Sequence, residues 1–285
     1  QTKKSIGIVS TSELQDATPA AVVAHTRKRA DKAEITGMML DVQPEVVLGG
    51  GSAYFLGKET PGSKRKDDID HVALYREAGY TLATSKGELE AAAGSNTGKV
   101  LGLFHTGNLD TTLDREFLKK GTIDKFPEQP GLVQMTQTAL DVLSRNRDGF
   151  VLVVEAANVD KMSHPLDWDR AVMDTIEFDK AVGLARDFAA SNPDTLVIVT
   201  GDHTHGVSII GTVDDDSRAR RCARRSAPMP RPASRTMSTA MATATPTALT
   251  CRAGCSRTPT TARITTRPIV RSSTAPSFRL FRTRR

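Results

Sequence analysis

Short apolar runs and longer segments with helical spacing alternate along residues 5–200 of the chain. The runs are rich in β-branched residues, which is typical of buried strands. We expect strands at residues 5–11 (SIGIVST), 44–48, 80–84, 100–104, 150–154 (FVLVV) and 195–200 (TLVIVT). Apolar residues that recur every three or four positions predict helices at residues 70–78, 87–93, 132–146 and 168–190.

Strands that alternate with helices predict an α/β fold with a mostly parallel central sheet and helices on both of its faces. One further helix is expected after the first strand. Asp16 and Thr18 offer capping oxygens, Pro19 suits the first turn, and AAVVAHTRKRA continues the helix to residue 30. Because a strand begins so close to Gln1, we expect the first strand or strands of the fold to be missing from this chain.

The composition changes abruptly near residue 217. Residues 217–285 contain sixteen Arg and no Lys, Asp, Glu or His, and all three cysteines lie there. The whole chain has 39 Lys and Arg against 33 Asp and Glu, so residues 1–216 keep 23 basic and 33 acidic residues. A segment of Arg, Ala, Ser, Thr and Pro buries too little apolar area to offset its ordering entropy. We therefore expect a folded domain at residues 1–216 and a disordered basic tail at residues 217–285.

Two explanations of this tail stay open. A reading-frame error after about residue 216 of a GC-rich gene would produce such a switch, since a shifted frame through residues 241–247 can encode an acidic loop. Alternatively, the tail is a genuine basic arm that binds polyanions. Its only aromatic residues are Phe278 and Phe281, so it would contact nucleic-acid phosphates nonspecifically. No segment of the sequence resembles a signal peptide or a membrane span.

Three polar clusters occur where expected strands end. In open α/β sheets, ligands bind outside the carboxyl ends of the strands, and a parallel sheet brings those ends to one edge. We therefore expect the clusters to meet. Their members are Asp16 and Thr18 after the first strand, Glu155, Asp160, Lys161 and His164 after FVLVV, and Asp202, His203 and His205 after TLVIVT.

Carboxylates and imidazoles in the last two clusters suit a zinc site. Asp160 and His164 are four residues apart, so one helical turn would place them on the same face. Taken singly, each motif has a plainer interpretation: a solvated helix face for this pair, and a helix cap for Asp16 or for Asp202. The glycines at residues 49–51 fit a turn better than a phosphate loop.

Taken together, the motifs resemble the alkaline phosphatase family, especially its bacterial branch. QDATPAA at residues 15–21 closely matches that family, and VEAANVDKMSH at 154–164 resembles its V-E-G-x-x-I-D-x-x-x-H. TGDHTHG at 200–206 resembles its T-A-D-H-x-H, while VVLGGG and LGLF match lesser landmarks in the same order. The resemblance covers about residues 5–212 and implies an alkaline-phosphatase-like fold.

The resemblance implies two zinc ions and one magnesium ion at the sheet edge. Asp160 and His164 would bind the first zinc, and Asp202 and His203 would bind the second. His205 would orient one of these ligands.

The remaining residues divide between magnesium and phosphate. By resemblance, Thr18 and Glu155 would bind magnesium, with Asp16 beside them. Arg29 lies thirteen residues after Asp16 and would clamp phosphate with its planar guanidinium, and Lys161 would lie near the phosphate.

The family hydrolyses phosphate monoesters in two displacements through a phosphoserine. Its nucleophilic Ser lies in an Asp-Ser-Ala motif upstream of QDATPAA, and an earlier Asp bridges zinc and magnesium; neither occurs here. The only Asp-Ser pair is Asp216–Ser217, and no His follows His205 to supply the family's third ligand of the first zinc. We therefore expect this chain to lack the nucleophile.

Two alternatives to an active phosphomonoesterase remain. One is a metal- and phosphate-binding fragment without turnover, and the other is a related phosphodiesterase or sulfatase. QDATPAA and Arg29 favour the monoesterase among the enzymes. The resemblance further implies phosphate monoesters and inorganic phosphate as partners, no specific nucleic acid, a periplasmic or secreted location, and a family in which homodimers occur.

Overall fold

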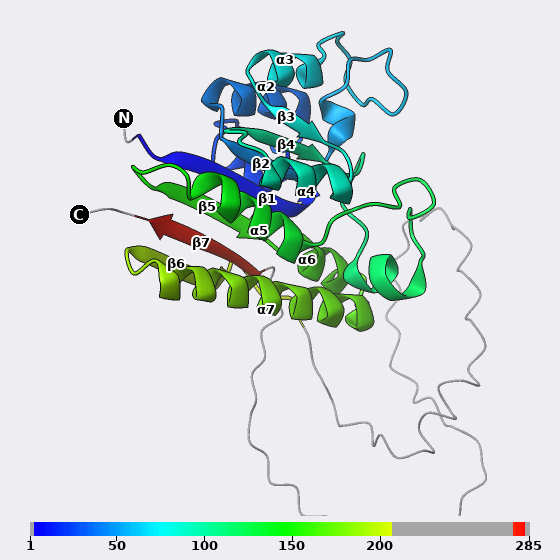
Figure 1. The fold of residues 1–285 in the computed structure, drawn as a ribbon. Helices are drawn as coiled ribbons and strands as arrows, with labels where there is room; N and C mark the ends of the chain where they lie inside the picture. Colours follow the sequence, from blue (N-terminus) through cyan, green and yellow to red (C-terminus); the bar gives the residue numbers. More distant parts are fainter. Residues whose placement is uncertain (1–2, 207–275, 283–285) are drawn as a thin grey trace, which may run out of the picture. The chain divides into compact units, whose positions relative to one another are not determined.

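A seven-stranded sheet in the order β3-β4-β2-β1-β5-β7-β6 lies at the centre of the structure (Figure 1). The computed structural model describes residues 3–206 and 276–282. Its strands are β1 (Ser5–Glu13), β2 (Val46–Gly50), β3 (Thr81–Ala83), β4 (Val100–Leu103), β5 (Phe150–Glu155), β6 (Thr195–Gly201) and β7 (Pro276–Arg282). The strands from β3 to β5 are all parallel, and β7 is antiparallel to both β5 and β6. Strand β6 therefore runs in the same direction as β5.

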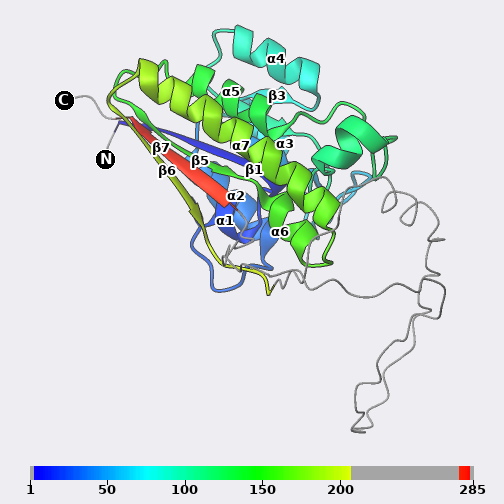
Figure 2. The ribbon, with the colours of Figure 1, turned by 90° about the horizontal axis from the view of Figure 1, so that it is seen from below.

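Helices cover both faces of the sheet (Figure 2). Neighbouring residues of one strand point to opposite faces, so Ile8 packs in the layer of α2 and α3 while Val9 packs in the layer of α4, α5 and α7. The predicted α/β fold with a mostly parallel sheet is thus confirmed. The helices are α1 (Ala17–Ala20), α2 (Lys32–Val42), α3 (His71–Glu77), α4 (Lys86–Gly94), α5 (Leu132–Leu143), α6 (Ala157–Ser163) and α7 (Trp168–Ser191), with short helices η1 (Ser52–Tyr54) and η2 (Leu113–Leu118). Within the described residues, none of these is long and apolar enough to cross a membrane.

The helix expected up to residue 30 is much shorter in the structure. Helix α1 is capped by Asp16 as predicted but ends at Ala20. The Thr26 hydroxyl accepts a hydrogen bond from the Lys28 amide, a local turn that competes with helical hydrogen bonding. The chain then forms α2, which the sequence patterns did not reveal. This turn carries Arg29 back to Asp16, so the shorter helix is a condition of the site described below.

Strand β7 differs from the expectation that residues 217–285 carry no fold. It pairs with β5 on one side and β6 on the other, and it satisfies main-chain groups that both neighbours would otherwise leave unpaired. The segment PSFRLFR also holds both aromatic residues of the tail, a composition that favours a strand more than the rest of the tail does. The predicted domain boundary near residue 216 lies outside the described residues.

The glycines at the end of β2 allow two loops to approach closely. A Cβ at Gly50 would lie 2.0 Å from the Gly107 carbonyl oxygen, and Gly51 has φ +84°. The Gly51 amide donates a hydrogen bond of 2.9 Å to that same carbonyl. This close contact supports the turn interpretation of the glycine run.

A buried network of charged side chains fastens η2 to α7. Asp174 is only 2% exposed and accepts a hydrogen bond from the Thr112 amide, and the Thr112 hydroxyl lies 3.3 Å from its Oδ1. The same hydroxyl donates to Glu177 at 2.8 Å, and Arg115 binds Glu177 at 2.9 Å. Burial and the neighbouring charge of Glu177 raise the pKa of Asp174 to about 7, although Arg115 and Thr112 partly oppose this. Above a pH of about 7, Asp174 is therefore ionised beside the charge of Glu177, and this destabilises the network.

The variant Asp174→Asn should stabilise the fold at pH 8 by roughly 2–4 kcal/mol. The folded pKa of Asp174 lies above its ordinary value of 3.8, so the parent loses stability as pH rises between about 4 and 7. The stability gap should widen across that window and stay constant above it. Urea unfolding at pH 5, 6, 7 and 8 measures the gap, and Asp179→Asn on the exposed face of α7 is the matched control. A gap that does not change with pH would contradict the raised pKa.

Candidate active site

The carboxyl ends of β1, β5 and β6 meet at one cavity of about 80 Å³. Glu155 is the last residue of β5, Asp202 follows directly on β6, and Asp16 lies three residues beyond β1. Of the ten residues singled out in the sequence, eight line this cavity: Asp16, Thr18, Arg29, Glu155, Asp160, Lys161, Asp202 and His203. The other two, His164 and His205, contact Asp160 from outside the lining.

Asp16 holds the two cationic side chains of the cavity. Lys161 donates to its Oδ2 at 2.7 Å, and Arg29 forms an ion pair with its Oδ1. Burial alone would raise the pKa of Asp16, but Lys161 and Arg29 lower it to about 2. Both carboxylate oxygens are thus engaged with cations rather than free for a metal ion. The arrangement keeps an ammonium and a guanidinium side by side, which suits an anion with several oxygens.

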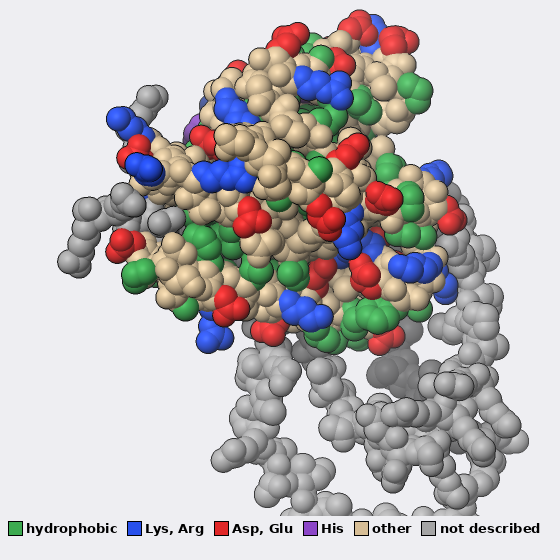
Figure 3. Space-filling model, viewed as in Figure 1, with side chains coloured by type: hydrophobic (Ala, Val, Ile, Leu, Met, Phe, Trp, Pro, Cys, Tyr) green, Lys and Arg blue, Asp and Glu red, His purple; other side chains and the backbone are tan. Residues whose placement is uncertain are grey.

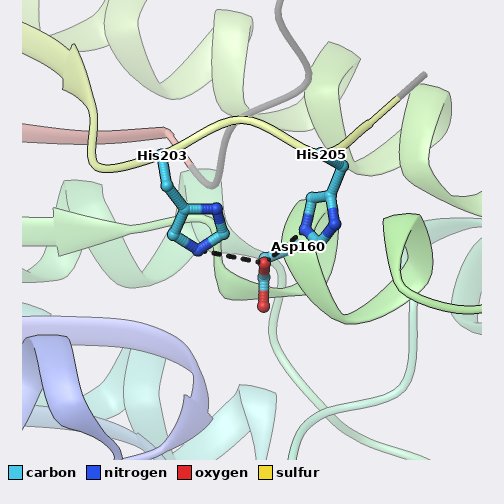
Figure 4. Close-up of side chains that lie close together, drawn as sticks. All are labelled: Asp160, His203 and His205. Carbon is cyan, nitrogen blue, oxygen red and sulfur yellow. Dashed lines mark hydrogen bonds and ion pairs between the residues drawn. The ribbon is translucent and has the colours of Figure 1, made fainter. Parts of the chain in front are cut away.

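Three imidazoles lie near the carboxylate of Asp160, and Figure 4 shows two of them, those of His203 and His205. His205 Nε2 lies 2.7 Å from Asp160 Oδ1, and His203 Nε2 lies 3.5 Å from the same oxygen. His164 approaches the other oxygen at 3.4 Å. Potential ligand atoms of Asp160, His203 and His205 all lie within 4.8 Å of one another. A carboxylate among nitrogen donors at this spacing fits the mixed ligand set of zinc.

Glu155 is held in a different, oxygen-only environment. Ser10 Oγ donates to Glu155 Oε2 at 2.5 Å, and Ser12 Oγ lies 3.3 Å from the same oxygen. Burial raises the pKa of Glu155, and the charge of Asp16 adds to the rise, whereas hydrogen bonds from Ser10 and Thr18 oppose it. Oxygen donors of this kind are those that magnesium prefers.

The cavity carries more negative than positive groups. Its lining has four carboxyl groups, from Asp16, Glu155, Asp160 and Asp202, and two cationic side chains. Acidic groups packed together without compensation are unfavourable, and a divalent cation removes that cost. The donor chemistry and the charge balance thus both fit metal ions.

Comparison with known proteins identifies the family of this chain. A profile of the alkaline phosphatase family matches residues 1–246. The alkaline phosphatase of Escherichia coli K12 is 36% identical over 236 residues, which cover 72% of this chain. The chain belongs to the alkaline phosphatase family. The crystal structure of Thermus thermophilus alkaline phosphatase superposes on 70% of this chain, and on 40% of its own length, with a TM-score of 0.61 and 32% identity.

The chain spans about half the length of the curated alkaline phosphatases it matches, 50% for the protein of E. coli. The alkaline phosphatase family is metal-dependent. A mutant of the TAB5 alkaline phosphatase with magnesium bound shares the fold of this chain, at a TM-score of 0.55 and 24% identity over 70% of the chain and 52% of its own length.

The grouping of imidazoles in the structure differs from the pairs expected from the family motifs. The motifs pair Asp160 with His164 and Asp202 with His203, whereas the closest group in the structure is Asp160, His203 and His205. His203 bridges the two expected pairs, because its Nε2 lies 3.5 Å from Asp160 and 3.6 Å from Asp202. The direct contact of His205 with Asp160 is consistent with an orienting role for His205.

Sequence patterns missed the two serines beneath Glu155. Ser10 and Ser12 are both 0% exposed, and they interrupt the apolar sequence of β1 just before it ends. Two hydroxyl residues at alternate positions of a buried strand point to one face and need polar partners there. That signal was present in SIGIVSTSE, but its partner on β5 becomes visible only in the folded chain.

Histidines that received no role from the sequence lie outside this cluster. His105 is buried, hydrogen-bonds Thr122 at 2.8 Å, and accepts from the Gly107 amide at 2.8 Å. His71 is buried at the start of α3. Burial lowers the pKa of both imidazoles. Both residues thus belong to the packed interior. The Asp216–Ser217 pair lies outside the described residues.

Proposed function

We propose that this site is that of a metal-dependent phosphomonoesterase. The observation that carries the proposal is the cavity itself. It joins a cation pair, Arg29 and Lys161, to a cluster of carboxylates and imidazoles at the carboxyl edge of a parallel sheet. A phosphoryl group has several oxygens and matches the cation pair, while the neighbouring cluster is suited to metal ions. Family membership favours a phosphate monoester as the substrate.

In this proposal the two donor environments hold different metals. Asp160, His164, Asp202 and His203 would hold two zinc ions, and Thr18 and Glu155 would hold one magnesium ion beside Asp16. Zinc ions bound there would polarise a phosphoryl oxygen and lower the pKa of a coordinated water or hydroxyl group.

The chain's own residues bind and orient the substrate. Asp16 fixes Lys161 and Arg29 in place, so both cations face the cavity before a substrate arrives. The guanidinium of Arg29 is largely exposed and keeps N–H groups that Asp16 does not engage. It can therefore grip two phosphate oxygens at once. His205 holds Asp160 through a hydrogen bond and so limits where that carboxylate can bind a metal.

In the family, the chemical step uses a serine nucleophile that lies in an Asp-Ser-Ala motif. The Asp-Ser-Ala motif does not occur in the sequence, and no serine is among the described residues that line the cavity. We infer that the family's phosphoserine route is closed to this chain as written. Binding of metal and phosphate with little turnover is accordingly the second candidate function.

Further points on location, assembly and the C-terminal segment belong to the same proposal. We propose a periplasmic or secreted location and a homodimer, on the basis of membership of the alkaline phosphatase family. The boundary of the phosphatase domain near residue 216 and a frame error beyond it also remain proposals. That the chain binds no specific nucleic acid also remains a proposal; acidic and basic side chains are interspersed on the face that Figure 3 shows.

Replacing Arg29 by Ala should weaken the binding of inorganic phosphate about 10- to 100-fold. Charge-assisted hydrogen bonds contribute roughly 1.5–3 kcal/mol, and a bidentate contact would be lost. Isothermal titration of the zinc- and magnesium-loaded chain with phosphate measures the change. Arg76→Ala, an exposed Arg on α3, is the matched control. The proposed function fails if the parent binds no phosphate, or if both variants bind it as the parent does.

A further inference from the structure

We propose that Ser10 and Ser12 position Glu155 to hold a small divalent cation such as magnesium. The inference rests on the proposed function, because it assumes that Glu155 binds a metal. It adds two residues that contact the carboxylate rather than the cation. Their contribution would be to fix where the carboxylate lies.

The backbone puts these residues together. Strands β1 and β5 are parallel neighbours, and Ser10 is the residue directly paired with Glu155 in their register. Side chains of paired residues project from the same face of a sheet, and Ser12 projects from that face two positions further along β1. The two hydroxyls therefore lie beneath the carboxylate as a consequence of strand pairing rather than of a mobile loop.

The hydrogen bonds give Ser10 a defined direction. Ser10 Oγ accepts a hydrogen bond of 3.0 Å from the Ser12 amide, and its single proton is then donated to Glu155 Oε2 at 2.5 Å. Ser12 Oγ lies 2.8 Å from Ser10 Oγ and 3.3 Å from the same carboxylate oxygen. Both serines are fully buried, so water cannot replace these donors without a rearrangement. The contacts fix one oxygen of Glu155.

Fixing the position of the Glu155 carboxylate should affect the binding of magnesium more than the binding of zinc. Magnesium demands near-ideal octahedral geometry from oxygen ligands, whereas zinc at the imidazole-rich cluster around Asp160 depends on other residues. Partners that orient a metal ligand typically change metal affinity 10- to 100-fold when they are removed. Loss of the serine hydroxyls should therefore weaken magnesium binding selectively.

The test compares metal binding by Ser10→Ala and the parent chain, with Mg²⁺ alone and Zn²⁺ alone as probes in isothermal titration. We expect magnesium affinity to fall about 10- to 100-fold and zinc affinity to change less than about threefold. Ser12→Ala should have a smaller effect, because its contact with Glu155 is longer. Ser5→Ala is the matched control. Ser5 is also buried on β1, but its hydroxyl accepts from Asn146, far from the cavity.

Each outcome decides the proposal. Equal magnesium affinity in Ser10→Ala and the parent would overturn the positioning role and leave the proposed function standing. A parallel loss of zinc and magnesium affinity would indicate a general structural role and would also overturn it. If the parent chain binds zinc and phosphate but no magnesium, the proposed magnesium site does not exist, and the positioning role is overturned with it. If Ser10→Ala does not fold, Ser10→Cys keeps the side-chain size with a weaker donor, and the same selective loss is expected.

Discussion

Replacing Asp160 by Ala should lower the zinc affinity of this chain by about 10³-fold. Asp160 is the carboxylate on which His164, His203 and His205 converge, with contacts of 2.7 to 3.5 Å. A residue that only orients a metal ligand changes metal affinity about 10- to 100-fold, so loss of the ligand itself should cost more, about 4 kcal/mol or three orders of magnitude in affinity. Competition with a chromogenic zinc chelator at pH 7.5 measures the dissociation constant.

Two comparisons show whether the effect is specific. Asp169→Ala changes an exposed carboxylate in the first turn of α7 and should leave zinc affinity unchanged. His205→Ala should cost only about 10- to 100-fold if His205 orients Asp160 without binding the metal. An Asp160→Ala chain that binds zinc as tightly as the parent would remove Asp160 from the metal site. It would leave the exposed residues after β6 as the remaining ligands.

Much of the fold could be predicted because strand signals in this chain are local. The runs SIGIVST, FVLVV and TLVIVT carry their β-branched composition within a few residues, and β1, β5 and β6 form where they predict. Parallel pairing then brings the ends of these strands to one edge, which is why residues far apart in sequence line a single cavity.

The predicted local structure differs from the observed structure where contacts between distant parts of the chain outweigh the local preference of the sequence. A run from Ala17 to residue 30 is compatible with a helix, yet the chain turns after Ala20, and Arg29 reaches Asp16 only because of that turn. Strand β7 depends on the two neighbours that flank it, and neither neighbour is near it in sequence. Propensity is a weak indicator in both places, since the deciding partners are distant.

The candidate site, like the fold, could be predicted only in part from the sequence. The carboxylates and imidazoles could be chosen from their position after strands. The roles of Arg29 and Lys161 came from the resemblance to the family, and the pairing of all these residues could not be predicted. Which imidazole lies nearest Asp160 depends on the path of the chain after β6, where His203 and His205 both turn toward α6. The buried serines beneath Glu155 were missed for a related reason, because a hydroxyl within a strand has no identifiable partner until its register is known.

The chain as written, loaded with zinc and magnesium, should hydrolyse a chromogenic phosphate monoester far below a typical enzyme rate of about 10 s⁻¹. The reason is chemical. Under the proposed function, Arg29 and Lys161 would hold the phosphoryl group, and without an Asp-Ser-Ala motif in this sequence the attack would be left to water. We expect a loss of at least about 10³-fold relative to that rate, similar to the loss of a nucleophile in other covalent catalysts.

The Asp160→Ala chain shows where any residual hydrolysis takes place. If water attacks the phosphate held at this site, the slow rate should fall to that of buffer in Asp160→Ala and remain in Asp169→Ala. A residual rate that both variants share would come from a contaminant or from another surface of the protein. A parent chain that turns over at about 10 s⁻¹ and loses this activity in Asp160→Ala would show that the chain supplies a nucleophile the sequence motifs did not reveal. Acid quench of that reaction would then trap the phosphorylated residue, and peptide mapping would identify it.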